Sequence, residues 1–528
     1  MKINFNWKSI LPHAAAILFF LILTVGYMSP MMEGERLIAH DNVQSIGLSQ
    51  ELKKNYEETG KINRWTNSVF SGMPAFRIWG SSKLNEISKV ISLFKLSLPK
   101  PMSNLFFYLI GFYIFMVAMG MSPILSAIAA IAFAFGSYNI ILLEAGHSTK
   151  ATTIATIPMV FAGVYLVYIK KKYLLGGALA ALFFAMAIRS NHVQIGYYIA
   201  FMLIFFVISE AIFAFKEKRI KDFVMGSLIL LAAGALGLAT NTSYLWTTYE
   251  YSKESIRGGK SELSSKKNDS GGLDTDYAWR WSCGKSETLT LLVPNFAGGA
   301  STSSLGESSN TYKELSRNRV PANQAKRFIS NLPTYHGDQP FTSGPVYIGS
   351  IIFFLALIGM ILAPARYKYW LMTLTVVTIF MSWGKNWTDF NMLFFENMPM
   401  YNKFRVPAMA LVMTSFAMLW LAVIGLKEIL NNKDKAKLTF AWKLASGICA
   451  AILLILLFVA GGLDYSSNSD SQFGANQQWI IDAIKKDRAA MFRSDVFRSL
   501  IFIALAAAAI FFYIRKSIKK EYLLIGIG

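Results

Sequence analysis

Ionisable side chains gather in short polar segments that follow or separate strongly apolar stretches of the chain. The first candidate for chemistry is Asp41, near the start of the polar segment 37–74. A carboxylate at a membrane surface is partly desolvated, which suits it to act as a general base or as a metal ligand. The alternative is structural: Asp41 caps the helix that the residues up to Gly60 predict.

A second polar segment is the turn LLEAGHSTK, which carries Glu144, His147 and Lys150 at intervals of three residues. An acid, an imidazole and an ammonium in so short a turn could bind a metal or hold a phosphate. Together with Asp41, the residues Glu144 and His147 are candidate ligands of a divalent cation, Mg²⁺ or Mn²⁺. Snorkelling toward the membrane interface explains Lys150 alone but explains the other two less well.

Three further places offer groups for phosphate or sugar. The turn IRSNHVQ contributes Arg189 and His192, and the segment YNKFRVP contributes Arg405. Arginine matches phosphate in a bidentate geometry, so these turns are candidate phosphate sites. In the first polar segment Arg64 stands beside Trp65, which could stack on a sugar ring. A place in the interfacial aromatic belt is the other reading of Trp65.

The composition places all these residues in a membrane protein. Of 528 residues, 54% are hydrophobic and only 16% are charged, and the mean hydropathy is +0.40. The net charge of +21 could suggest a nucleic-acid partner, but a nucleic-acid binder concentrates its charge on one solvated face. Here the basic residues stand in short clusters between apolar runs, which sets orientation in a membrane. We therefore expect a lipid bilayer as partner and no nucleic acid.

Apolar runs long enough to cross a bilayer predict an all-α polytopic bundle of about twelve transmembrane helices. The first run reads as a retained signal anchor, and a thirteenth span that would begin at Tyr522 stops short, which suggests that the natural protein continues. The predicted spans are residues 11–28, 103–121, 123–143, 151–169, 173–189, 193–214, 223–242, 346–363, 369–383, 406–426, 440–461 and 498–514.

Orientation follows from the loops. With a cytoplasmic N-terminus, the short inner loops hold the basic clusters at 170–172, 216–221, 366–368, 427–437 and 515–520, as the positive-inside rule requires. The long polar segments then lie on the outer face, at 29–102, 243–345, 384–405 and 462–497. We expect a multi-pass protein of the bacterial cytoplasmic membrane whose active site is on the outer face.

Three regions divide the chain on this basis. They are an N-terminal membrane module, 1–242, whose first outer loop holds the candidate active site; a large outer loop, 243–345; and C-terminal membrane helices, 346–528. The Ser- and Gly-rich stretch 258–275 is expected to be flexible.

In the first outer loop, apolar residues between Ile87 and Leu98 repeat at helical spacing, with Lys89 and Lys95 on the opposite face. The pattern is typical of an amphipathic helix. Such a helix lies in the membrane interface or packs on the protein's own surface, and the sequence leaves both open.

Four short motifs carry a resemblance to a known family: HDN at 40–42, RWTNSVFSGMP at 64–74, FAFGSYN at 133–139 and FRVP at 404–407. With the anchor, the first outer loop and the acidic turn, the chain resembles the GT-C superfamily of integral-membrane glycosyltransferases. More narrowly, it resembles the bacterial YfhO-like membrane proteins.

The resemblance implies transfer of a sugar from a polyprenyl-phosphate-linked donor to an acceptor that is an envelope polymer, a glycan or a lipid. It implies Asp41 as base or metal ligand, Glu144 as the second acid, and Arg405 as the residue that recognises the donor phosphate. Two departures weigh against a metal: Asn42 stands where a paired acid would follow Asp41, and the turn 142–150 has no DxD motif.

Two other classes of function compete with this one. A transporter or flippase of lipid-linked precursors would place ionisable residues near the bilayer midplane, whereas the predicted spans are nearly free of charge at their centres. Glu210 is the nearest exception, toward the inner end of its span. The third class is a scaffold for envelope assembly, without catalysis.

Overall fold

The computed structural model describes residues 7–79, 85–258 and 271–528, and almost all of its regular structure is helical. In the described residues, the named strands form one short antiparallel pair, β1 (Trp65–Thr66) with β2 (Met73–Pro74). The prediction of an all-α polytopic membrane protein is confirmed at this level. Residues 259–270, most of the stretch expected to be flexible, lie outside the described residues.

The chain divides into two compact units that are interleaved along the sequence. The first comprises Met1–Ala134, Asn139–Tyr197 and Arg219–Tyr244. The second comprises Phe135–Tyr138, Tyr198–Lys218 and Leu245–Gly528. Each unit is described here by itself.

The first unit contains the anchor, the first polar loop and the helices that follow it. Its helices are α1 (Trp7–Tyr27), α2 (His40–Thr59), α3 (Ile87–Phe94), α4 (Met102–Ala118), α5 (Pro123–Ala134), most of α6 (Ser137–Glu144), α7 (Ser148–Tyr168), α8 (Tyr173–Arg189) and α10 (Ile220–Ala239).

The second unit contains most of α9 (Val193–Lys216) and everything after Tyr244. Its remaining helices are α11 (Thr242–Lys253, which begins in the first unit), α12 (Thr275–Ala278), α13 (Asn310–Arg317), α14 (Ala322–Ile329), α15 (Ser350–Leu362), α16 (Ala365–Ser382), α17 (Thr388–Asn397), α18 (Leu411–Asn431), α19 (Lys435–Val459), α20 (Gln478–Ile514) and α21 (Lys520–Ile527).

In the described residues, seven helical stretches are long and apolar enough to cross a membrane, or eight if α5 and α6, which bend by 50° at their break, form one span. Helices α4, α8 and α15 are apolar but shorter. Every one of the twelve predicted spans falls on a helix or on the broken pair. The sequence therefore located the apolar helices, but fewer than twelve of them are long enough to count as a full span.

One predicted boundary is wrong. The span predicted at 346–363 begins only at Ser350, because the preceding residues are not helical and Tyr347 accepts a hydrogen bond from the backbone N–H of Ser137 (3.2 Å). The predicted outer segment 462–497 and the predicted span 498–514 share one helix, since α20 begins at Gln478 and runs for 37 residues.

Helix α7 is the centre of the first unit, and every residue of its apolar window is buried. It packs against α4 and α8, and the backbones approach closely where the facing residue is glycine. A Cβ on Gly111 of α4 would lie 2.3 Å from the carbonyl oxygen of Ala155, and one on Gly163 would lie 2.6 Å from the backbone nitrogen of Ala180. Small residues at such crossings are typical of membrane helix packing.

Helix α3 packs on the first unit's own helices, as the second reading of this segment expects. The Phe94 ring meets those of Phe107 (6.2 Å between centroids) and Phe183 (6.3 Å), and Arg189 Nε donates to Ser88 Oγ at 2.7 Å. Lys89 is exposed as predicted. Lys95 is turned inward, so the prediction that it lies on the exposed face of the helix, with Lys89, is wrong.

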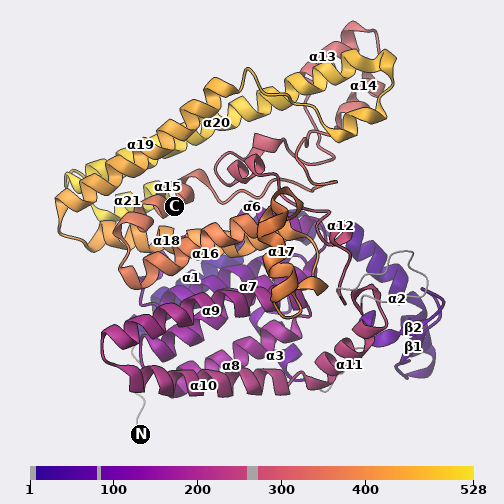
Figure 1. The fold of residues 1–528 in the computed structure, drawn as a ribbon. Helices are drawn as coiled ribbons and strands as arrows, with labels where there is room; N and C mark the ends of the chain where they lie inside the picture. Colours follow the sequence, from indigo (N-terminus) through magenta and orange to yellow (C-terminus); the bar gives the residue numbers. More distant parts are fainter. Residues whose placement is uncertain (1–6, 80–84, 259–270) are drawn as a thin grey trace. The chain divides into compact units, whose positions relative to one another are not determined.

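In the second unit, α18 packs on α15 and α16. Helices α19 and α20 run side by side, and α13 and α14 pack against the N-terminal end of α20 (Figure 1). The small core there joins these elements through Leu315, Ala325, Ile329, Leu332, Ile480 and Ile484.

The substitution Gly111→Ala should destabilise the first unit, because the new methyl group must push α4 and α7 apart. Overpacking of this kind costs about 1–3 kcal/mol. Gly234→Ala in α10 is the matched control, since nothing lies within 4 Å of its added Cβ. Thermal unfolding of the purified protein in detergent measures both, and equal melting temperatures for the two variants would contradict the close packing of α4 on α7.

Candidate functional site

The turn between α6 and α7 lies against the first turn of α2. Gly146 adopts φ +82°, a left-handed conformation that favours glycine. A Cβ at this position would lie 2.8 Å from the Cβ of Ala39 and 3.2 Å from Cγ of Asn42. The absence of a side chain at Gly146 therefore lets the two segments touch, and it brings His147 beside the start of α2.

Asp41 and His147 form a close pair at this contact. The distance from His147 Nδ1 to Asp41 Oδ2 is 2.7 Å, with the aspartate side chain half exposed and the imidazole about one third exposed. The N-cap of α2 is Ala39 and no side chain caps the helix. Asp41 therefore does not take the capping role considered for it, although the predicted helix end at Gly60 is confirmed.

The surroundings of His147 keep its imidazole neutral near pH 7. Burial lowers the pKa of His147 from its usual value, the Lys150 cation lowers that pKa further, and the Asp41 carboxylate opposes both. The carboxylate favours the tautomer with the proton on Nδ1, where it can accept that hydrogen bond. The lone pair of Nε2 is then available to accept a proton.

A second polar cluster, not anticipated from the sequence, lies at the same end of α7. The Lys95 ammonium donates to Asn104 Oδ1 and to Thr152 Oγ1, each at 2.6 Å. Burial lowers the pKa of Lys95 to about 7, and the nearby Lys100 cation acts in the same direction. In the sequence, the only sign of this cluster is that Lys95 stands at the end of an apolar helical pattern. The inward direction of its side chain depends on contacts with α4 and α7.

Both clusters share the first two turns of α7. His147 directly precedes the helix and Thr152 is its fifth residue, so the two positions differ by about 7.5 Å along the axis. The N-terminal end of an α-helix carries a partial positive charge. The Asp41–His147 pair and the half-buried ammonium of Lys95 thus lie at one positively polarised helix end.

The other predicted residues of the first unit lie in separate places. Glu144 is the exposed last residue of α6, and Arg64 is exposed on the hairpin. The Trp65 ring lies against Gly72, whose added Cβ would be 2.7 Å from Trp65 Nε1, and half of its surface remains exposed. His192 accepts the backbone N–H of Ile195 through Nδ1 (3.2 Å) at the start of α9.

Arg405 belongs to the second unit. Its guanidinium donates to the hydroxyl of Tyr277 and lies over the rings of Tyr277 and Trp281, at 5.4 and 6.0 Å from their centroids. The site residues predicted from the sequence therefore fall in both units. The structure brings Asp41, His147 and Lys150 together in the first unit, whereas Arg405 contacts Tyr277 and Trp281 in the second unit.

The residues present fit a metal site poorly. Among the described residues, no three His, Cys, Asp or Glu side chains gather where they could hold a metal ion. Asp41 and His147 supply two such groups, and they bind each other. We therefore derive no step through Mg²⁺ or Mn²⁺ at this pair.

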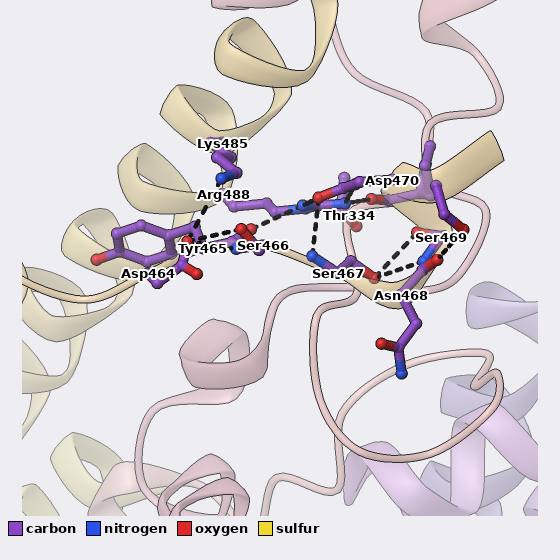
Figure 2. A network of polar contacts seen from close by, with 12 residues as sticks. Thr334, Asp464, Tyr465, Ser466, Ser467, Asn468, Ser469, Asp470, Lys485 and Arg488 are labelled. Carbon is purple, nitrogen blue, oxygen red and sulfur yellow. Dashed lines mark hydrogen bonds and ion pairs between the residues drawn. The ribbon is translucent and has the colours of Figure 1, made fainter. Parts of the chain in front are cut away.

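A buried network in the second unit surrounds Arg488 (Figure 2). Its guanidinium is fully buried and binds both carboxylate oxygens of Asp470, at 2.8 and 2.9 Å. It also donates to the carbonyl oxygens of Tyr465 (2.7 Å) and Pro333 (2.6 Å). The charge is compensated and enclosed, so we assign this network to holding the loop before α20 against the helix.

The Asp41–His147 pair predicts opposite pKa changes in two variants. Asp41→Asn removes the group that raises the pKa of His147, so this pKa should fall. Lys150→Met removes a neighbouring cation, so the same pKa should rise. NMR titration of histidine-labelled protein measures both, with the His147 signal identified among five histidines by its loss in His147→Gln. Shifts of the same sign in both variants would contradict the geometry.

Gly146→Ala should separate the pair, because a methyl group at φ +82° is strained and collides with Ala39. In this variant, a further Asp41→Asn change should leave the His147 pKa nearly unmoved. Gly47→Ala in α2, which has open space at its added Cβ, is the control and should keep the wild-type response. An unchanged response in Gly146→Ala would show that the contact does not position His147.

Comparison of the chain with protein-family models, with curated proteins and with solved structures finds no match.

Proposed function

We propose that this protein is a membrane glycosyltransferase of the GT-C type, similar to the YfhO-like bacterial proteins. It transfers a sugar from a polyprenyl-phosphate-linked donor to an envelope polymer, glycan or lipid. The basic clusters in the short loops support a cytoplasmic N-terminus and a reaction at the outer face of the cytoplasmic membrane.

The observation that carries the proposal is the Asp41–His147 pair at the polar end of α7. Sugar transfer to a hydroxyl requires removal of a proton as the new bond forms. An imidazole that is neutral near pH 7 and held through Nδ1 by a carboxylate is suited to that task. Its place at the end of a buried apolar helix suits a donor whose reactive group is attached to a lipid.

In the proposed step, His147 Nε2 takes the proton of the acceptor hydroxyl while that oxygen bonds to the anomeric carbon. The bond from the anomeric carbon to the phosphate oxygen breaks, and the lipid phosphate leaves with the electron pair. Asp41 then acts as a positioning residue that stabilises the imidazolium, in place of the base role implied by the resemblance. Lys150 adds positive charge beside the pair.

A flippase of lipid-linked precursors is the second candidate, and one observation favours it. Helices α5 and α6 bend by 50° at their break, and discontinuous helices are common in transporters. A flippase would move the lipid-linked sugar between leaflets without breaking its bond to phosphate.

The test is transfer from a radiolabelled polyprenyl-phosphate sugar by protein in lipid nanodiscs. His147→Gln should lower the rate by about 10²–10⁴, the usual contribution of a general base, and Asp41→Asn should lower it by a smaller factor. Lys54→Gln, at a largely exposed lysine farther along α2, should stay within about twofold of wild type, within the small effects usual for surface substitutions.

Wild-type rates in His147→Gln would remove His147 as the base. Intact lipid-linked sugar recovered in the opposite leaflet of liposomes, with no product formed, would replace the transferase by the flippase. In cells, loss of the protein should cause lipid-linked sugar to accumulate.

A further inference from the structure

Lys95 is held inward by the backbone that follows it. It ends α3, and the next two residues, Leu96 and Ser97, both adopt left-handed conformations with φ near +50°. Such conformations are unusual for residues other than glycine and cost about 1 kcal/mol or more each. The chain thus accepts strain at the point where the lysine turns toward α4 and α7.

The charge of Lys95 has no counter-charge in the described part of the protein. Its hydrogen-bond partners are the neutral oxygens of Asn104 and Thr152, and the cation Lys100 is nearby. Burying an ammonium without an opposite charge is unfavourable. The contrast with Arg488, which binds Asp470 through two nitrogens, suggests that an anion from outside the chain completes the Lys95 site.

A further donor lies in the same cluster without a partner. Asn104 is 1% exposed, and while its Oδ1 accepts from Lys95, its Nδ2 has no hydrogen-bond partner among the described residues. Asn104 is the third residue of α4, and Thr152 lies in the second turn of α7. The N-terminal end of α7, an ammonium and a free amide are therefore close together, and all of them favour an anion.

Aromatic rings border the cluster on one side. Phe107 lies 5.6 Å from the ammonium, and its ring is in contact with Phe94, which also meets Phe183. A free phosphate ion gains nothing from such neighbours. A phosphate attached to an apolar chain would place its charge at Lys95 and its chain against the rings.

We propose that Lys95, Asn104 and the N-terminal end of α7 bind the phosphate group of a lipid phosphate. This inference rests on the proposed function, since the lipid phosphate would be the part of the donor that leaves. It adds a site for that group within the first unit, at the helix end that also carries His147. Lys95 is then a binding residue whose positive charge stabilises the departing phosphate.

Binding can be measured without sugar or acceptor. The full-length protein in detergent is titrated with farnesyl phosphate, with farnesol as the uncharged counterpart and inorganic phosphate as the chain-free counterpart. Lys95→Met should weaken farnesyl phosphate binding at least tenfold, and Asn104→Leu severalfold. Lys89→Met is the matched control on the same helix, because Lys89 is exposed and paired with Glu86 at 2.9 Å, and it should change binding less than twofold.

Thermal unfolding separates binding from a purely structural role. Without ligand, Lys95→Met should be at least as stable as wild type, because it removes a buried uncompensated charge. Farnesyl phosphate should raise the melting temperature of wild type and of Lys89→Met but not that of Lys95→Met. Lys95→Arg keeps the charge and should retain part of the shift.

Equal binding by Lys95→Met and Lys89→Met, or equal affinity for farnesol and farnesyl phosphate, would overturn the proposal. Inorganic phosphate binding as tightly as farnesyl phosphate would overturn the lipid assignment and leave a site for free phosphate. Lipid phosphate binding by a wild-type protein that transfers no sugar would refute the glycosyltransferase while supporting this site.

Discussion

The tight packing of α7 against α4 and α8 restricts where polar chemistry can occur in the first unit. Glycine at positions 111 and 163 lets the helix backbones touch, and the whole apolar window of α7 is buried. An unpaired polar group inside such a bundle would be costly. Ionisable groups therefore gather where the helix begins, at the turn that Gly146 allows to lie against α2.

At that helix end, the charges are only partly balanced. His147 lies between an anion, Asp41, and a cation, Lys150, whose effects on its pKa oppose each other while burial lowers it. Lys95 instead has neutral partners and a second lysine nearby. One cluster is suited to moving a proton, and the other to receiving negative charge, which are the two needs of transfer from a lipid phosphate.

Two other buried ion pairs, at Glu210 and at Arg488, are arranged differently. Glu210 forms a two-point ion pair with Arg366, whose backbone carbonyl also accepts from Ser209, and Arg488 is enclosed by Asp470 and two carbonyl groups. These pairs link segments that are distant in the sequence, and their charges are already compensated. An opposite charge supplied by the protein itself thus separates these two ion pairs from Lys95.

The sequence by itself determined the membrane class, the positions of the apolar helices, the end of α2 at Gly60 and the turn that holds His147. These follow from composition, apolar periodicity and glycine, which act over short stretches of chain. Only the tertiary structure decided that Asp41 meets His147, that Lys95 points inward, and that Arg488 is paired with Asp470. The direction of a side chain depends on which distant segment packs against it, and helical periodicity carries no information about that partner.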